Sequence, residues 1–323
     1  MQFLIAWIGV FSVASISLVF AQETDSLSAV QKLRLRGALV EAQQLAEREL
    51  SVSPQDPRSE IELRLELARI FDRYGLHQNS RPVAAALEQI EAADSVAKHA
   101  GEASQAMVAL ARANYSYRAE MKERLFPLAS ANARRARTLF QHKADKHGEA
   151  EAVHLLGLIH LQRGENELAR EHFEESLVLD REGGERVFFR GEYERHVGFV
   201  YLRSEGSEAA IPYFERSLAY RKQAGAVDAS LFAANSLASA LVDVGRAEEA
   251  WPSLTYAMMV AEQLDSIRGK AMNGWVLGQL YEQKQDIDAA RIAYEMTIKI
   301  AESIGLNSIS DRASQALLRL AAP

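Results

Sequence analysis

The chain has 323 residues, of which 48% are hydrophobic and 25% are charged, and its formal net charge is −7. An acidic chain argues against nucleic acid as a partner, because phosphate backbones are bound by clustered Lys and Arg. The chain contains no cysteine, which excludes disulfides and thiolate metal sites. Its stability must therefore come from the packing of apolar side chains.

The first 21 residues contain no charged side chain and are mostly apolar from Phe3 to Phe20. Small residues at Val19 and Ala21 fit a signal-peptidase site, so we predict that 1–21 is a signal peptide and Gln22 the mature start. An uncleaved membrane anchor is the alternative, since an apolar run of about 18 residues is long enough to span a bilayer. We therefore expect a periplasmic or secreted protein, with no stable membrane anchor if the segment is removed.

The next segments predict helix pairs of irregular spacing. Residues 22–57 form a diverged first pair, in which apolar residues of the second helix recur every three or four positions. Pro54 and Pro57 then interrupt the helical pattern. A second pair is expected over 58–74 and 81–99, and a third over 102–121 and 125–146.

From residue 150 onward the chain repeats itself. Residues 150–183 read as two short helices joined at Gly164, and the same layout returns after 41 residues and then twice more after 40. Each unit places a small residue in the first helix and an apolar or aromatic residue in the second. The first unit carries Leu156-Gly157 followed by Ala169-x-x-x-Phe173. The equivalent positions later in the chain are Val197-Gly198-x-x-Tyr201 with Ala210-x-x-x-Phe214, and Leu277-Gly278-x-x-Tyr281 with Ala290-x-x-x-Tyr294.

This pattern resembles the tetratricopeptide repeat, a helix–turn–helix unit with the motif Leu-Gly-x-x-Tyr, Ala-x-x-x-Phe. Two features depart from it: the spacing is 40 or 41 residues instead of 34, and the proline that ends each unit is missing. The longer unit is similar to a branch that includes MalT and the peptide-sensing Rap proteins.

The resemblance implies an all-α fold, a right-handed α–α superhelix of about six helix pairs. We expect the solenoid to occupy 58–305, after the diverged pair, and a capping helix to occupy 306–323. Such a cap is needed because a terminal repeat otherwise exposes its apolar face.

No catalytic motif is found. None of the eight histidines forms the helical pair with glutamate that a zinc site shows, and neither a phosphate-binding glycine loop nor a Gly-x-Ser-x-Gly elbow is present. We therefore predict a protein that is not an enzyme and that needs no metal or cofactor.

The resemblance also implies a binding surface, because the first helix of each pair lines the concave groove of such solenoids, and this groove commonly binds peptides. Carried over to this chain, the groove residues are Asn114, Arg118, His154, Leu158, Arg195, Phe199, Asn235, Ser239, Trp275 and Gln279. The arginines and Asn235 suit a carboxylate, and the aromatic residues suit an apolar side chain. The alternative is that these are ordinary solvent-facing positions.

Together these features predict a non-enzymatic protein- or peptide-binding scaffold of the cell envelope that takes a ligand with an acidic or C-terminal carboxylate group. The alternative is the input component, or sensor, of a signalling system that acts on a separate membrane-bound effector.

Overall fold

The computed structural model describes residues 27–52, 56–78 and 84–321, and the regular structure in these ranges is helical throughout. Residues 27–35 form the first described helix. It is followed by α2 (Leu39–Val52), α3 (Pro57–His77), α4 (Ala84–Ala97), α5 (Glu102–Ala119), α6 (Pro127–His142), α7 (Lys146–Arg163), α8 (Asn166–Glu182), α9 (Val187–Ser204), α10 (Ser207–Gln223), α11 (Val227–Asp243), α12 (Ala247–Gln263), α13 (Ile267–Gln283), α14 (Ile287–Ser303) and α15 (Asn307–Ala321).

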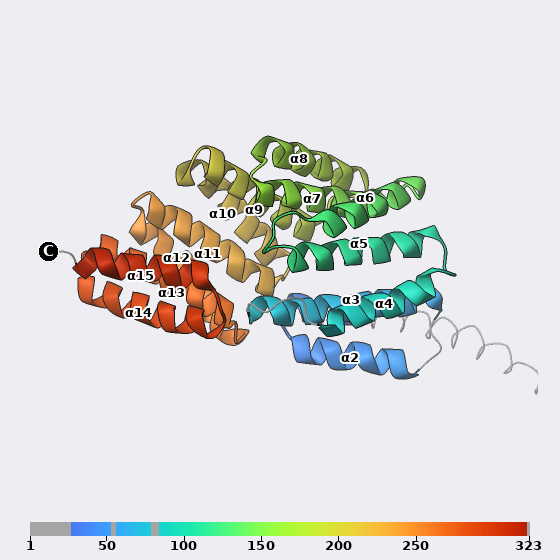
Figure 1. Cartoon of the computed structure of the whole chain (residues 1–323), viewed down its shortest axis with the longest axis horizontal. Helices are drawn as coiled ribbons and strands as arrows, with labels where there is room; N and C mark the ends of the chain where they lie inside the picture. Colours follow the sequence, from blue (N-terminus) through green and yellow to red (C-terminus); the bar gives the residue numbers. More distant parts are fainter. Residues whose placement is uncertain (1–26, 53–55, 79–83, 322–323) are drawn as a thin grey trace, which may run out of the picture.

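Successive helices pack in antiparallel pairs that stack side by side into a curved solenoid (Figure 1). Within the described ranges the pairs begin with 27–35 and α2 and end with α13 and α14, while α15 packs on the last pair. The all-α repeat architecture is thus confirmed. The count is seven pairs, which corresponds to the diverged first pair and about six further pairs that the sequence predicts.

The repeat motif has a direct packing reason. A Cβ atom on Gly157 would lie 2.7 Å from the ring of Phe173, and one on Gly198 would lie 2.6 Å from the ring of Phe214. The glycine of the first helix therefore makes room for the aromatic side chain of the second. Both aromatic side chains are fully buried, at 0% and 1% exposure, so each pair is held by one large apolar contact.

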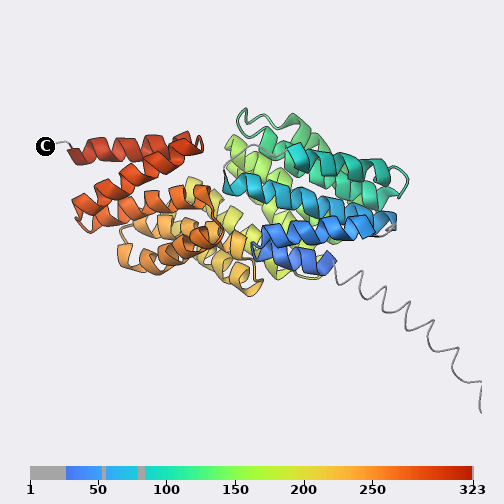
Figure 2. The same ribbon diagram turned by 90° about the horizontal axis from the view of Figure 1, so that it is seen from below.

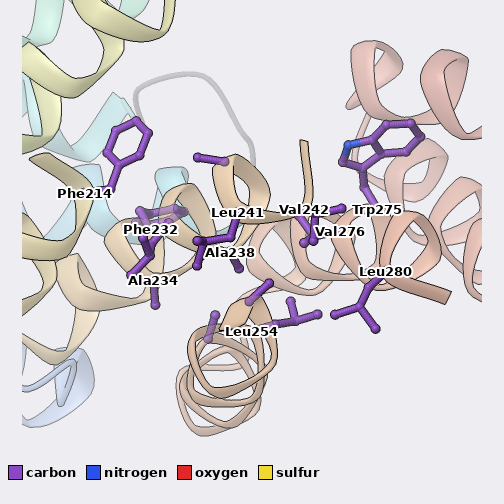
Figure 3. Packing of buried hydrophobic residues seen from close by; sticks show 14 of the residues in the cluster. Phe214, Phe232, Ala234, Ala238, Leu241, Val242, Leu254, Trp275, Val276 and Leu280 are labelled. Atoms are coloured by element: carbon purple, nitrogen blue, oxygen red, sulfur yellow. The ribbon is translucent and has the colours of Figure 1, made fainter. Parts of the chain in front are cut away.

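A large apolar cluster joins the C-terminal pairs. It runs from Phe214 in α10 through Leu241 and Leu254 to Trp275 and Leu280 in α13 (Figure 3). The helices of this region bury most of their apolar faces on adjacent helices of the stack, as in other repeat proteins.

The N-terminal region departs from that rule, because the end of α3 lies against α11 and the start of α13 (Figures 1 and 2). His77 Nδ1 is 2.8 Å from Ser266 Oγ, and His77 Nε2 is 3.2 Å from Asp228 Oδ1. Arg73 Nε is 3.3 Å from Asp228 Oδ2. We call these four residues, Arg73, His77, Asp228 and Ser266, the closing contact, because they complete one turn of the solenoid.

No helix in the described ranges is both long enough and apolar enough to span a membrane. Residues 1–21, for which we predict a signal peptide, lie outside these ranges. The signal peptide stays a prediction, and so does the cell-envelope location that depends on it.

Candidate functional site

The closing contact encloses the concave side, where a cavity of about 490 Å³ lies. Its walls come from the helix over 27–35 and from α3, α4, α5, α7 and α9. Apolar side chains form part of the wall, among them Leu65, Ile90, Leu110, Leu155, Leu158, Phe188 and Phe189. Charged or polar side chains form the rest, among them Arg34, Glu66, Arg69, Asp72, Arg73, Asn114, Glu151, His154, Arg186, Glu192 and His196.

On the α3 side, one carboxylate faces two guanidinium groups. Glu66 is only 1% exposed; it accepts a hydrogen bond from Arg34 Nε at 2.8 Å and pairs with Arg69 as well. Burial alone would raise the pKa of Glu66, but Arg69 and Arg34 outweigh it and lower that pKa. Glu66 is therefore ionised, and this wall keeps an excess positive charge. The Arg69 side chain is 49% exposed, which leaves it accessible to a ligand.

On the α9 side, a carboxylate and two histidines meet. Glu192 Oε1 pairs with Arg221 Nη2 at 2.7 Å, and Glu192 Oε2 is 4.0 Å from His196 Nδ1. Burial raises the pKa of Glu192, whereas Arg221, Arg73 and Arg195 lower it, and the net shift is downward. His154 Nε2 lies 2.9 Å from His196 Nδ1. Burial lowers the pKa of His154 to about 4, so both imidazoles are neutral near pH 7.

Arg195 stands beside this pair. Its guanidinium lies over the ring of Phe199, 4.7 Å from the centroid, and its Nη1 is 3.5 Å from His196 Nε2. Within the described part of the chain, Arg195 has no carboxylate at ion-pair distance, and its buried Nε has no hydrogen-bond partner. Burial and Arg221 lower the pKa of Arg195 to about 9, because together they outweigh the opposite effect of Glu192.

The residues predicted for the groove fall in different places. Asn114, His154 and Leu158 line the cavity. Arg118 pairs with Asp72, another lining residue. Arg195 is not a lining residue, and it contacts the cavity wall through His196.

The remaining predicted residues lie outside the cavity lining. Phe199 packs edge-on to Phe214, with 5.2 Å between the ring centroids. Asn235 is 5% exposed and donates from Nδ2 to Asn273 Oδ1 at 2.8 Å. Ser239 and Gln279 are half-buried on α11 and α13. Trp275 is 6% exposed, under the guanidinium of Arg312 from α15 at 4.4 Å.

The charged residues of α3 were not anticipated from the sequence. Glu66, Arg69 and Arg73 recur every three or four positions, and apolar residues on both sides of this stripe are buried in separate clusters. A helix with a narrow charged stripe between two apolar faces is buried on two sides, and its stripe faces an interior space. This pattern in the sequence of α3 therefore indicates that the charged stripe lines an internal cavity.

Ser266, His77 and Asp228 are connected in the order of a serine-hydrolase triad. Their surroundings do not suit catalysis. Ser266 is 0% exposed and accepts a hydrogen bond from Gly269 N at 3.1 Å, so it caps the start of α13. None of the three residues lines the cavity. The trio is therefore a structural contact that closes the solenoid. Within the described ranges, no group of three or more His, Asp or Glu residues is arranged so that it could hold a metal ion.

Comparisons with known proteins agree with this geometry. Residues 150–182 and 275–303 match the sequence model of the tetratricopeptide repeat. The chain contains tetratricopeptide repeats. A search of curated proteins found no sequence match.

Several solved structures share the fold. A Rap protein complexed with competence and sporulation factor is similar with a TM-score of 0.57 and 13% identity, over 93% of this chain and 97% of that one. The Rap conjugation gene regulator of plasmid pLS20, in complex with the Phr* peptide, gives a TM-score of 0.57 and 16% identity, over 84% and 78%. Aspartyl phosphate phosphatase F from Bacillus subtilis gives a TM-score of 0.53 and 14% identity, over 99% of this chain and 95% of that one. At these identities the likeness establishes the fold: a helical solenoid of the Rap type.

Proposed function

We propose that this protein is a non-enzymatic scaffold that binds a peptide, or an extended segment of a protein, in the concave cavity. The cavity itself carries the proposal. A volume of about 490 Å³ lies in the range of ligand sites, and apolar walls with a few fixed polar groups are typical of them. A similar solenoid, the pLS20 regulator, holds a peptide.

The charges in the wall favour a ligand with an acidic or C-terminal carboxylate group. Arg69 shares its carboxylate partner with Arg34, and Arg195 has no carboxylate at ion-pair distance among the described residues. A guanidinium binds a carboxylate through two parallel hydrogen bonds. The apolar side chains nearby, such as Leu155 and Leu158, would contact the rest of the ligand.

We further propose that the protein acts in the cell envelope, in the periplasm or outside the cell. The proposal depends on residues 1–21 and their predicted cleavage before Gln22. Cell fractionation together with N-terminal sequencing of the native protein tests it. A mature chain that begins at Met1, or that is recovered in the cytoplasm, would overturn it.

One observation favours the second candidate, a sensor that acts on a separate membrane-bound effector. The helix α3 supplies Arg69 and Asp72 to the cavity wall and His77 to the closing contact. Occupancy of the cavity and closure of the solenoid are therefore linked through one rigid helix, as a sensor requires.

The peptide-binding proposal is tested by selecting from a random peptide library with the purified protein. Ala111 lines the cavity, so Ala111→Trp should fill it and abolish binding of the selected peptides. Ala131→Trp, on the exposed face of α6, is the matched control and should bind as the wild type does. If no peptide is selected, or if Ala111→Trp binds equally well while remaining folded, the proposal is wrong.

A further inference from the structure

The histidine pair and Arg195 form one directed chain of hydrogen bonds. Ser176 Oγ donates its single proton to the carbonyl oxygen of Phe173 at 2.7 Å. It can therefore only accept from His154 Nδ1, which lies 3.5 Å away. His154 Nδ1 thus carries the proton, and His154 Nε2 must accept from His196 Nδ1 at 2.9 Å.

The contact at the Arg195 end of this series of hydrogen bonds gives the same direction of donation. A guanidinium can only donate, so the 3.5 Å contact between Arg195 Nη1 and His196 Nε2 makes Nε2 an acceptor. His196 then carries its proton on Nδ1, as the first end requires. One arrangement satisfies every contact: Arg195 donates to His196, His196 donates to His154, and His154 donates to Ser176.

This arrangement excludes a further proton while Arg195 stays in place. A second proton on His196 would point Nε2–H at the N–H group of Arg195, and one on His154 would point Nε2–H at the Nδ1–H group of His196. Burial, then His154, Arg195 and Arg221, hold the pKa of His196 well below its usual value. The histidines share their surroundings with Arg69, Asp72 and Arg73 from α3, Glu151 from α7, Arg186 and Glu192 from the start of α9 and Arg221 from α10.

We propose that Arg195, which contacts the lining residue His196 from behind the cavity wall, binds an anionic group of the ligand and that His196 takes up a proton when this group draws Arg195 away. The proposal deepens the proposed function, on which it rests, by adding pH control to the same site. A contact of 3.5 Å is long for a hydrogen bond, so a carboxylate that makes two charge-assisted bonds displaces it. His196 Nε2 is then left without a donor and beside an anion, and both changes favour its protonation.

The sign of the effect follows from linkage. Because the bound anion raises the pKa of His196, anion binding tightens as the pH falls from the pKa of the bound state towards that of the free state. One proton changes the affinity by at most about tenfold per pH unit. The acidic side of neutrality therefore favours the loaded form.

Nuclear magnetic resonance of the full chain with ¹⁵N-labelled histidine tests the first step without a ligand. Long-range ¹H–¹⁵N spectra distinguish the two neutral tautomers, and we expect His154 and His196 both to carry the proton on Nδ1. An Nε2–H signal from either histidine would overturn the proposal. Arg195→Met should raise the pKa of His196. The exposed Arg170 of α8 pairs with Glu167, so Arg170→Met is the control and should leave that pKa unchanged.

Sodium formate, the smallest carboxylate, is the probe for the second step. Formate should raise the pKa of His196 in the wild type and leave it unchanged in Arg195→Met, with sodium chloride at equal ionic strength as the reference. No shift in the wild type overturns the proposal even where selected peptides bind. A formate response without any selected peptide would instead count against the proposed function alone. If Arg195→Met fails to fold, Arg195→Lys takes its place, with a weaker formate response expected because a lysine cannot bind a carboxylate bidentately.

Discussion

The repeats from α7 to α14 and the closing contact hold the same molecule together by different means. In the repeats, Gly157 and Phe173 or Gly198 and Phe214 meet a short distance apart in the sequence, and apolar area supplies the stability. In the closing contact, His77 meets Ser266 across 189 positions through buried polar groups. The comparison shows that local apolar packing builds the solenoid, whereas a few charged groups fix its curvature and enclose the cavity.

Asp228→Asn should have the largest effect, because it tests whether the closing contact stabilises the solenoid and keeps it compact. Asp228 is 3% exposed and has both Arg73 and His77 as partners. Removing one member of a buried charged set costs about 3–5 kcal/mol, because the others stay buried without compensation. Urea unfolding should show this loss, and small-angle X-ray scattering should show an expanded molecule. Asp311→Asn, at an exposed position of α15, is the control. An Asp228→Asn variant as stable and as compact as the wild type would contradict the assigned role.

The free energy of unfolding should depend on pH differently in the two regions, the repeats and the closing contact. Burial lowers the pKa of His154 to about 4, below the value of about 6.5 for an exposed histidine. His154 therefore binds a proton in the unfolded chain but not in the folded chain, and its contribution to stability falls by roughly 3 kcal/mol as the pH drops from about 6.5 to about 4. The loss should be smaller in His154→Gln, and the part that remains is due to His196, whose pKa is also held well below its usual value.

The closing contact responds at lower pH. Burial raises the pKa of Asp228, but Arg73 and His77 outweigh it and lower that pKa to about 2. Its stabilisation is present above the usual aspartate value and is lost as the pH falls through about 2. Denaturant midpoints measured across both ranges check the assignment. A single transition that is unchanged in His154→Gln would contradict it.

The smallest expected effect is the difference between alanine substitutions at two glycines that have nearly the same backbone φ angle. Gly37 has φ +81° and faces the side chain of Leu264, whereas Gly164 has φ +80° and open space around it. Alanine at either site is strained by the left-handed conformation, at about 1–2 kcal/mol. Gly37→Ala must also displace Leu264, so it should cost about 1–2 kcal/mol more than Gly164→Ala. Equal losses of unfolding free energy for the two variants, in thermal or denaturant unfolding, would show that the turn at Gly37 is not packed against Leu264.

The sequence predicts the part of the fold that is local. Gly157 and Phe173, or Gly198 and Phe214, recur at a constant spacing because each pair packs in the same way. The closing contact could not be predicted from the sequence. The pitch of a solenoid is the result of small rotations between successive repeats, and no sequence motif specifies their total. His77 and Asp228 consequently look like unrelated surface residues in the sequence.

The candidate site was predictable in part for the same reason. Asn114 and His154 follow from the repeat register and line the cavity. Extending that register to Trp275 ignores the last helix, whose Arg312 lies over the indole ring. Arg69 and Glu192 enter the cavity wall because the solenoid turns back on itself, which only the three-dimensional arrangement reveals.

The contact between His77 and Ser266 also makes the two ends of the solenoid unequal. A stack of repeats ordinarily frays from both termini, because a terminal unit has one neighbour and inner units have two. Here α3 rests on α13 as well as on α2, α4 and α5, so the N-terminal side has gained an extra neighbour. Among the described helices, α15 packs mainly on α14 and to a lesser extent on α13. Amide protons of α15 should therefore exchange with solvent before those of α3, and melting should proceed from the C-terminal end.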